Sequence, residues 1–417
     1  MILKRILAVI SAAAISTAVI RFGTVTASAT TEGTPISTPQ ELMDMRPDGN
    51  YYLACDIDML DVKWKSVSDF SGHFNGNGYT ISSLYSETYG LFSTLKSGAV
   101  VENVTLSDVY IASKNKKVGA VASVIKSSEK NIKIDNCFVS GVVASCRTKF
   151  GRETRSTAGS IVGMNNSSSA VISNCYSNAV TAAERTAGGI VGTNRGTVKN
   201  CGFGGEIVNS YNVFELVTND GIKNDDWAYL YASGGIAGFN YGTISDCFSS
   251  SERIDAAMYY GGIAGVLQNG GSITRCVNSS EILYDDATGG LIAGYAAKKS
   301  TVSNCYSKKP TDSNVQNDIG KGKSGTVTYA VSSDKYGKIS SFKRLGDGWV
   351  IHGGEPVPKS IKKFISNQPK YKQVYKVKGE SLVSASDDDS NKPDEPDEPE
   401  KEASVDYGYD EFGDILE

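Results

Sequence analysis

The sequence contains few of the residues that carry most catalytic chemistry. It has two histidines among 417 residues, His73 and His352, so a metal site built from several imidazoles is excluded by number. Neither histidine belongs to an H-E-x-x-H motif, and no C-x-x-C or G-x-S-x-G motif occurs. We therefore expect no metal, no cofactor and no catalytic residue.

Long hydrophobic runs are also scarce, and the single one lies at the N-terminus. Lys4 and Arg5 precede an apolar run over Ile6–Ile20, which is shorter than the roughly 20 residues needed to cross a bilayer. A small-residue A-x-A site ends at Ala29. This pattern predicts a secretory signal over residues 1–29, with an uncleaved membrane anchor as the alternative. We expect a secreted or cell-surface protein with no membrane span after cleavage.

The net charge of −4 hides a strong asymmetry. Residues 387–417 contain 14 acidic and 2 basic side chains, a net of −12, which leaves the rest of the chain only mildly basic. We expect no nucleic-acid partner. Residues 373–417 are predicted to form a disordered acidic tail. Its end is either a solvated peptide or a docking segment for a basic partner, with these candidate residues: Tyr407, Tyr409, Phe412, Ile415 and Leu416.

Internal repeats dominate the rest of the sequence. Six Gly-Gly-apolar-apolar-Gly elements, the first of them degenerate, are each followed by a segment that ends in cysteine. These cysteines, spaced 38, 26, 46, 29 and 29 residues apart, are Cys137, Cys175, Cys201, Cys247, Cys276 and Cys305. Each repeat contains three short runs in which apolar and polar residues alternate, as in β-strands. Three such strands per repeat are expected for one triangular coil. We therefore predict an all-β protein folded as a right-handed parallel β-helix, a solenoid.

Stacked coils would place equivalent residues in columns. We expect the six repeat cysteines to form one vertical column of buried free thiols, with disulfides between successive coils as the alternative. Cys55 and Cys146 lie outside this series. We expect the repeat glycines at corners that need a positive φ. Asn and Asp before each cysteine are expected at turns or in a polar ladder.

The repeat motif resembles a known family. Gly188-Gly189-Ile190-Val191-Gly192 followed by Val198-Lys199-Asn200-Cys201 is similar to the GLUG repeats of bacterial surface proteins. The resemblance covers residues 34–306, and it implies a surface location. Such repeats also occur outside the catalytic domain of streptococcal IgA-specific metallopeptidases, whose zinc motif this sequence lacks.

The predicted organisation has five parts. Residues 1–29 form the signal, and residues 30–70 form an N-terminal cap with a short helix over residues 34–48. The sequence Thr38-Pro39-Gln40-Glu41 matches a capping box for that helix. The β-helix itself spans 71–309, with six GLUG-like repeats from residue 118. A C-terminal cap over 310–372 and the acidic tail complete the chain.

Aromatic residues near the repeat corners are the candidate ligand-binding residues. They are Trp227, Tyr229, Tyr231, Tyr259, Tyr260 and Tyr284. The long spacing between Cys201 and Cys247 predicts an inserted loop near Tyr211 to Trp227. Exposed Tyr and Trp suit carbohydrate or protein partners, whereas packing in the core or at corners is the alternative.

We interpret the chain as a non-catalytic surface or extracellular protein for adhesion, ligand binding or matrix assembly. One alternative is a polysaccharide-active β-helix enzyme, a lyase or hydrolase, which would need a groove with convergent carboxylates. The paired acids Asp225-Asp226 and Asp285-Asp286 do not stack in register, so we expect no such cluster. The other alternative is a spacer that presents the acidic tail to a partner.

Overall fold

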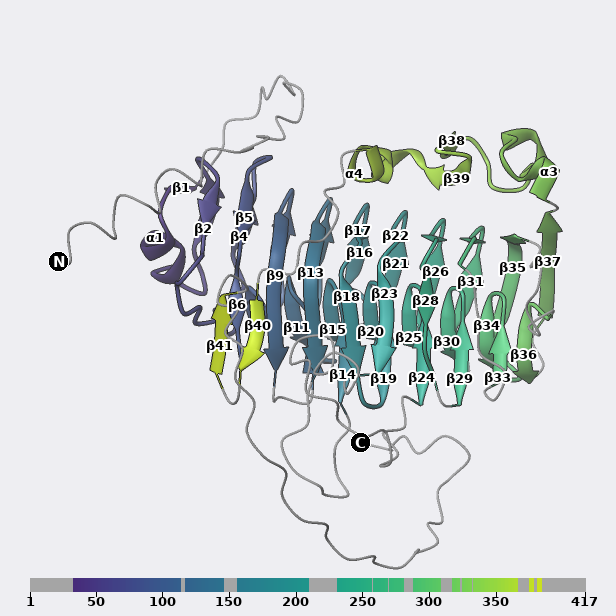
Figure 1. The fold of residues 1–417 in the computed structure, drawn as a ribbon, viewed down its shortest axis with the longest axis horizontal. Coiled ribbons are helices and arrows are strands. Elements are labelled where there is room, and N and C mark those ends of the chain that lie inside the picture. Colours follow the sequence, from purple (N-terminus) through teal and green to yellow (C-terminus); the bar gives the residue numbers. More distant parts are fainter. Residues whose placement is uncertain are drawn as a thin grey trace, which may run out of the picture.

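The chain winds into a parallel β-helix (Figure 1). The structure is a computed structural model, and it describes residues 33–113, 117–145, 156–209, 231–256, 258–268, 270–280, 288–308, 317–322, 325–331, 333–366, 375–378 and 381–384. Every strand pair within the coils is parallel, as successive turns of a solenoid require. The predicted fold class is therefore confirmed.

Three sheets form the walls of the β-helix. The eight-stranded sheet contains β7 (Phe92–Leu95), β11 (Ala122–Ile125), β15 (Val162–Asn165), β20 (Val191–Asn194), β25 (Ala237–Asn240), β30 (Ala264–Leu267), β34 (Ala293–Ala296) and β36 (Ile319–Gly322). The six-stranded sheet contains β10 (Lys117–Val118), β14 (Thr157–Gly159), β19 (Thr186–Gly188), β24 (Ala232–Gly234), β29 (Tyr259–Gly261) and β33 (Thr288–Gly290).

The large sheet has 23 strands in the described residues and bends along its length. Its first arm contains β1 (Thr34–Ile36), β2 (Asn50–Leu53), β4 (His73–Asn75), β8 (Val100–Glu102), β12 (Lys133–Asp135), β16 (Val171–Ser173), β21 (Thr197–Lys199), β26 (Thr243–Ser245), β31 (Ser272–Thr274), β35 (Thr301–Lys308) and β37 (Gly325–Val331). Its second arm contains β3 (Ile57–Asp58), β5 (Thr80–Ser82), β6 (Tyr85–Ser86), β9 (Thr105–Ser113), β13 (Phe138–Ser145), β17 (Tyr176–Ser177), β18 (Val180–Ala183), β22 (Gly202–Phe203), β23 (Glu206–Asn209), β27 (Phe248–Ser249), β28 (Arg253–Ile254) and β32 (Val277–Asn278).

The repeat glycines allow close backbone approach rather than unusual dihedral angles. A Cβ on Gly188 would lie 2.0 Å from the carbonyl oxygen of Val191 and 2.8 Å from the backbone nitrogen of Gly238 in the next coil. None of the Gly-Gly pairs in the six repeat elements has a positive φ, so the expectation that they serve left-handed corners is wrong. The corner between the six-stranded and eight-stranded sheets is simply too crowded for a side chain.

The left-handed backbone conformation falls instead on the residue before each cysteine. Its φ lies between 50° and 56° at Asn136, Asn174, Asn200, Asp246, Arg275 and Asn304. Asn103, which precedes Val104 at the equivalent position of the coil before, has the same conformation with a φ of 57°. Asn and Asp tolerate this region better than most residues because their short polar side chains bond locally. The Asn136 Nδ2 atom donates to Asn103 Oδ1 at 2.6 Å, and Arg275 pairs with Asp246 at 2.6 Å. The predicted turn position is therefore confirmed, and polar bonds between neighbouring coils form at some of these turns.

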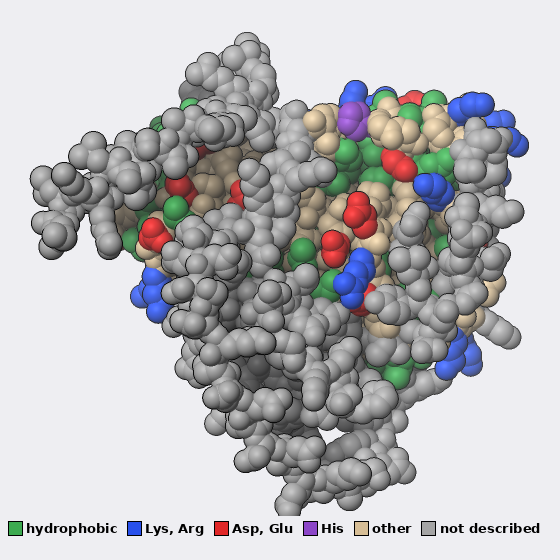
Figure 2. Space-filling view, viewed as in Figure 1, with side chains coloured by type: hydrophobic (Ala, Val, Ile, Leu, Met, Phe, Trp, Pro, Cys, Tyr) green, Lys and Arg blue, Asp and Glu red, His purple; other side chains and the backbone are tan. Residues whose placement is uncertain are grey.

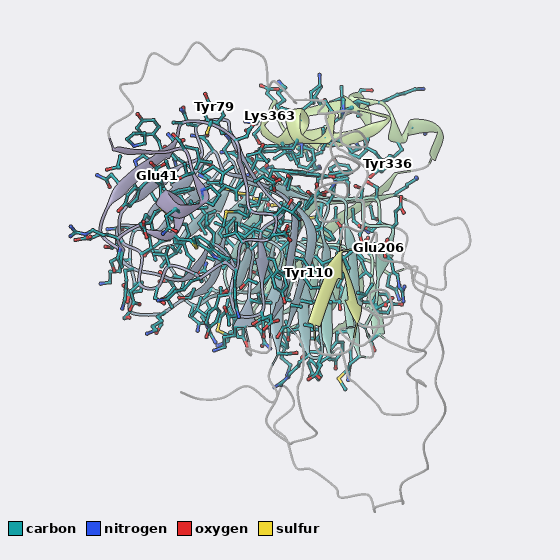
Figure 3. All side chains as sticks on the ribbon, turned by 60° about the vertical axis from the view of Figure 1, so that its left-hand side comes forward. Glu41, Tyr79, Tyr110, Glu206, Tyr336 and Lys363 are labelled. Carbon is teal, nitrogen blue, oxygen red and sulfur yellow. The ribbon has the colours of Figure 1, made fainter. Side chains whose placement is uncertain are left out.

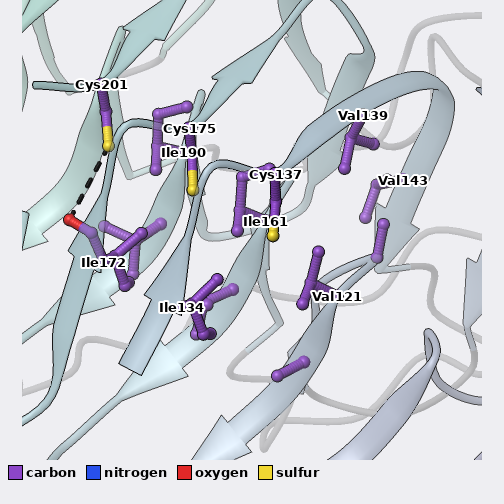
Figure 4. Close-up of a cluster of buried hydrophobic side chains, with 14 of the residues drawn as sticks. Val121, Ile134, Cys137, Val139, Val143, Ile161, Ile172, Cys175, Ile190 and Cys201 are labelled. Carbon is purple, nitrogen blue, oxygen red and sulfur yellow. Dashed lines mark hydrogen bonds between the residues drawn. The ribbon is translucent and has the colours of Figure 1, made fainter. Parts of the chain in front are cut away.

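The six repeat cysteines form one interior column, the cysteine column. Figure 4 shows three of them, Cys137, Cys175 and Cys201, in successive coils. Each is fully buried as a free thiol, and successive thiols lie beside one another among the apolar side chains of the core. The Cys201 thiol points to the Ile172 carbonyl oxygen of the previous coil at 3.7 Å. Burial raises the pKa of the Cys137 thiol, which keeps it protonated. Cys55 is half-buried outside this column, and Cys146 lies outside the described residues.

The N-terminal end is closed by helix α1 (Pro39–Met43). Thr38 and Glu41 form the predicted capping box, and Pro39 occupies the first helical turn. Leu42 is fully buried against the first coil. The helix is shorter than predicted over residues 34–48, because residues 34–36 pair with β2 as the strand β1.

The residues expected to cap the C-terminal end lie elsewhere. Residues 333–366, which we call the C-terminal strap, run back along the side of the coils (Figure 1). Figure 2 shows apolar and basic side chains gathered along this edge of the molecule. The strap contains α3 (Ser333–Tyr336), η1 (Ile339–Ser341), the antiparallel pair β38 (Trp349–His352) and β39 (Glu355–Pro358), η2 (Lys359–Ile361) and α4 (Lys362–Ser366). Figure 3 labels Tyr336 and Lys363 near its two ends.

The strap covers the outward-facing residues that follow the cysteines. The ring of Phe364 stacks on Phe138 at 5.7 Å, and Phe342 meets Tyr306 edge-on at 5.1 Å. The Ser279 hydroxyl donates to Glu355 Oε2 at 2.7 Å. These outward aromatic residues would face water without the strap, so burying them favours the lateral position over an end cap.

Part of the segment predicted as a disordered tail forms two strands. β40 (Tyr375–Lys378) and β41 (Ser381–Ser384) pair as antiparallel strands. Residues 385–417, including all tail docking candidates, lie outside the described residues, as does the predicted signal over 1–29. In the part of the chain that the structure describes, no helix is both long and apolar enough to cross a bilayer.

Candidate ligand-binding surface

A cluster of aromatic rings lies on the outside of the middle coils. β25, β30 and β34 pair in register, which aligns Phe239 with Val266 and Tyr295 in successive coils. Tyr259 on β29 and Tyr231, just before β24, join them from the neighbouring sheet. This cluster is separate from the interior core. We call its five rings the aromatic surface: Tyr231, Phe239, Tyr241, Tyr259 and Tyr295.

The five rings touch in a continuous row. Tyr295 contacts Tyr259 at 5.4 Å between ring centroids, and Tyr259 meets Tyr231 edge-on at 5.6 Å. Tyr231 stacks on Phe239 at 5.9 Å with an interplanar angle of 6°. Phe239 stacks in turn on Tyr241 at 6.3 Å. Each such pair adds about 0.5–1.5 kcal/mol beyond the area it buries, so the row is held rigidly.

Two guanidinium groups lie over these rings. The Arg195 carbon Cζ is 4.0 Å from the ring centroid of Tyr241, and that of Arg185 is 5.7 Å from Tyr231. A cation in this position is attracted to the negative face of the ring by roughly 0.5–1 kcal/mol at a partly exposed site. The surface therefore combines flat apolar faces with planar hydrogen-bond donors.

The burial of the rings sets which of them a ligand can reach. Phe239 and Tyr259 are buried, with 3% and 7% of their surface exposed. Tyr231, Tyr241 and Tyr295 are half-buried, so parts of these rings face solvent. Phe239 and Tyr259 thus support the row from below, and the three half-buried tyrosines form its accessible part.

The structure brings together only some of the sequence candidates. Tyr231 and Tyr259 meet in the aromatic surface. Tyr260 does not, because its ring is fully buried in the core, where the missing side chain of Gly289 in the next coil makes room for it. Adjacent strand residues point to opposite faces, which separates Tyr259 from Tyr260. Trp227, Tyr229 and Tyr284 lie outside the described residues.

Several members of the surface were missed in the sequence. Phe239 and Tyr295 each directly follow the Gly that closes a repeat element, Gly238 and Gly294 respectively. Reading that position across all repeats would have revealed them. Arg185 and Arg195 lie 46 residues from their ring partners, which is the spacing between paired residues of these two coils, so aligning the repeats would have placed each Arg beside its tyrosine.

A second polar cluster lies on the first arm of the large sheet. Lys133 Nζ contacts Glu102 Oε2 at 3.1 Å and Asp135 Oδ2 at 3.3 Å, while His73 Nε2 lies 3.0 Å from Glu102 Oε1. Asp135 pairs in register with Glu102, so two carboxylates of neighbouring coils align here. The paired acids considered in the sequence, Asp225-Asp226 and Asp285-Asp286, lie outside the described residues.

Lys133 partly offsets the negative charges of Glu102 and Asp135 in this second cluster. Burial alone would raise the pKa of Asp135, but hydrogen bonds from Ser173 and Asn174 and the nearby Lys133 lower it overall. Burial likewise opposes the charge on Lys133, yet the bond to Glu102 and the charge of Asp135 raise its pKa. Both side chains therefore stay ionised, as in a structural ion-pair network, rather than tuned towards neutrality for proton transfer.

The two histidines lie in different clusters. His352 is on β38 and lies within 3.2 Å of the Ser366 hydroxyl, whereas His73 contacts Glu102. In the described ranges, no group of three or more His, Cys, Asp or Glu side chains converges in a way that could hold a metal ion. The aromatic surface is thus the strongest candidate for ligand binding.

Comparison with known proteins finds likeness in structure alone. No protein-family model matches the sequence, and no curated protein matches it either. A Bacteroides ovatus protein described as a "putative immunoglobulin A1 protease" aligns with a TM-score of 0.47 and 19% identity, covering 80% of this chain and 94% of that one. A second structure, described as "IgA1 Protease", aligns with a TM-score of 0.51 and 18% identity over 78% of this chain. This chain spans a quarter of that protein, 25% of its length, and the likeness is one of fold.

Proposed function

We propose that this protein is an exported, non-catalytic β-helix protein that binds a glycan through the aromatic surface. The observation that carries the proposal is the row of five contacting rings flanked by two guanidinium groups. The predicted signal over residues 1–29 supports a secreted or cell-surface location. The register of the Gly-Gly elements and the cysteine column supports assigning the repeats to the GLUG class.

The chemistry of the surface favours a glycan with acidic groups. The C–H faces of sugar rings pack well on tyrosine rings, which supply rigid contact area with little loss of side-chain entropy. The guanidinium groups of Arg185 and Arg195 match carboxylate or sulfate oxygens through paired donors. A cell-surface protein that presents an acidic, aromatic patch is the second kind of partner to test.

Binding of the full chain to acidic and neutral polysaccharides tests this proposal. We expect Tyr241→Ala and Arg195→Ala each to weaken binding by about fivefold or more, because each removes a contact of about 1 kcal/mol. Tyr85→Ala is the matched control, since Tyr85 is also half-buried and pairs with Tyr110 at 6.2 Å away from this surface. An equal loss in the control, or binding by neither glycans nor surface proteins, would contradict the proposal.

A polysaccharide-active enzyme is the second candidate function, favoured by the aligned Glu102, Asp135 and Lys133. It predicts turnover of a polysaccharide that Glu102→Gln abolishes while glycan binding by the aromatic surface persists. Measured turnover of this kind would overturn the non-catalytic proposal. The spacer alternative predicts that deleting residues 387–417 removes all partner binding while the β-helix remains folded.

A further inference from the structure

The two ends of the β-helix are protected very differently. At the N-terminal end the edge strand β1 has only three residues, and Pro35 at its centre lacks a backbone N–H. Helix α1 adds Leu42, which is fully buried against this end. Short strands, proline and a covering helix are the usual means by which proteins prevent edge-to-edge pairing.

Among the residues that the structure describes, the longest edge at the C-terminal end has none of these features. β37 (Gly325–Val331) is a seven-residue strand with the sequence GTVTYAV, without proline or charge. Within the described residues it pairs with β35 alone, and it stands at the far end of the stack in Figure 1. The strap that follows runs along the side, where Tyr336 packs with Phe342 against Tyr306.

The neighbouring edge at the same end is better protected. β36 pairs with β34 and carries Lys321, and Gly322 has a positive φ of 101°. An edge lysine and a kinked backbone both disfavour further pairing. The pairing capacity of this end is therefore concentrated in β37, whose composition also has high β-propensity.

We infer that β37 is a self-association edge at which two copies of this chain pair through antiparallel β37 strands about a two-fold axis. A head-to-tail stack would need an open N-terminal end, which α1 and Pro35 block. Two identical C-terminal edges can instead satisfy each other's backbone donors and acceptors, and the closed pair leaves no free long edge. This inference does not depend on the proposed glycan binding.

Sedimentation of the full chain over a range of concentrations tests the inference. We expect a dimer with twice the 44.3 kDa mass of one chain, less the signal if it is cleaved. Val327→Lys places two like charges at the shared edge and should weaken the dimer by at least about tenfold. Val327→Thr is the control for strand propensity. Ser303→Lys, one coil inward and in register with Val327, is the control for the same charge away from the edge.

The two controls should remain dimeric, with circular dichroism confirming that all three variants are folded. Hydrogen exchange provides a test that needs no variant, because the amides of residues 325–331 should gain protection as the concentration rises. A monomer at every concentration, a dimer unaffected by Val327→Lys, or equal dissociation by Ser303→Lys would overturn the inference. Protection of β37 that is independent of concentration would also overturn it, since another segment of the same chain would then cover the edge.

Discussion

Replacing Asn194 by alanine should remove the centre of a buried polar ladder. Asn165, Asn194 and Asn240 are fully buried on successive strands of the eight-stranded sheet. The Asn165 Nδ2 atom donates to Asn194 Oδ1 at 3.1 Å, and Asn194 Nδ2 donates to Asn240 Oδ1 at 2.8 Å. Asn194 also bonds both the N–H and the carbonyl of Gly196 at 3.1 Å. One side chain thus satisfies polar groups in three coils.

The cost follows from the groups that would be left without partners. Asn194→Ala leaves the Asn165 Nδ2, the Asn240 Oδ1 and the Gly196 N–H buried and unsatisfied. Each such group costs about 1–3 kcal/mol, so we expect the free energy of unfolding to fall by about 3 kcal/mol or more. This is a large part of the 5–15 kcal/mol that typically stabilises a domain.

Urea unfolding followed by circular dichroism measures this loss. Thr197→Ala in the same coil is the control, because the half-buried Thr197 side chain lies on the outer face of β21 and should cost roughly 0.5 kcal/mol or less. The Asn165→Ala/Asn194→Ala double variant should lower the free energy of unfolding by less than the sum of the two single variants. The double variant also removes the Asn165 amide that Asn194→Ala alone leaves without a partner. If Asn194→Ala costs no more than Thr197→Ala, the reasoning about the ladder is refuted.

Three further predictions concern the strap, pH and the thiols. Gly202→Leu should displace the strap, because a Cβ at Gly202 would lie 2.4 Å from Ile361 Cδ1, so limited proteolysis of residues 333–366 should accelerate. The Ser97 backbone N–H donates to the Glu129 carboxylate at 2.9 Å and lowers the pKa of Glu129 from its ordinary value of 4.5 to about 2. The ionised Glu129 therefore stabilises the fold above pH 4.5, and this stability should be lost as the pH falls towards 2. In native protein a thiol reagent should modify the half-buried Cys55 far faster than the cysteine column, as mass spectrometry of labelled peptides would show.

Each of these predictions has its own control. Gly348→Leu lies within the strap where a Cβ meets nothing within 4 Å, so proteolysis should stay at the wild-type rate. In Glu129→Gln, the free energy of unfolding should fall less between about pH 4.5 and 2 than it does in the wild-type protein. An equal fall in both proteins would show that other carboxyl groups cause it. Native labelling of the cysteine column as fast as Cys55 would show that its thiols are not enclosed.

Local and periodic features of the sequence were sufficient for the scaffold. The recurring Gly-Gly elements and cysteines identified coils, because a solenoid repeats the same environment at each turn. The capping box at Thr38 identified the start of α1, because its bonds join residues only three apart. The role of the repeat glycines was misjudged, since crowding between coils depends on backbone positions that one repeat does not reveal.

The tertiary structure alone decided what lies on the outside of that scaffold. The strap joins Phe364 to Phe138 across more than 220 residues, and no sequence period links the two. The aromatic surface likewise needs the register of three coils before Tyr231, Phe239 and Tyr295 come together. Inward positions repeat because every coil meets the same neighbours, whereas outward positions depend on contacts that occur once. The sequence by itself therefore determined the interior columns, and only the folded chain determined the candidate binding surface and the open strand edge.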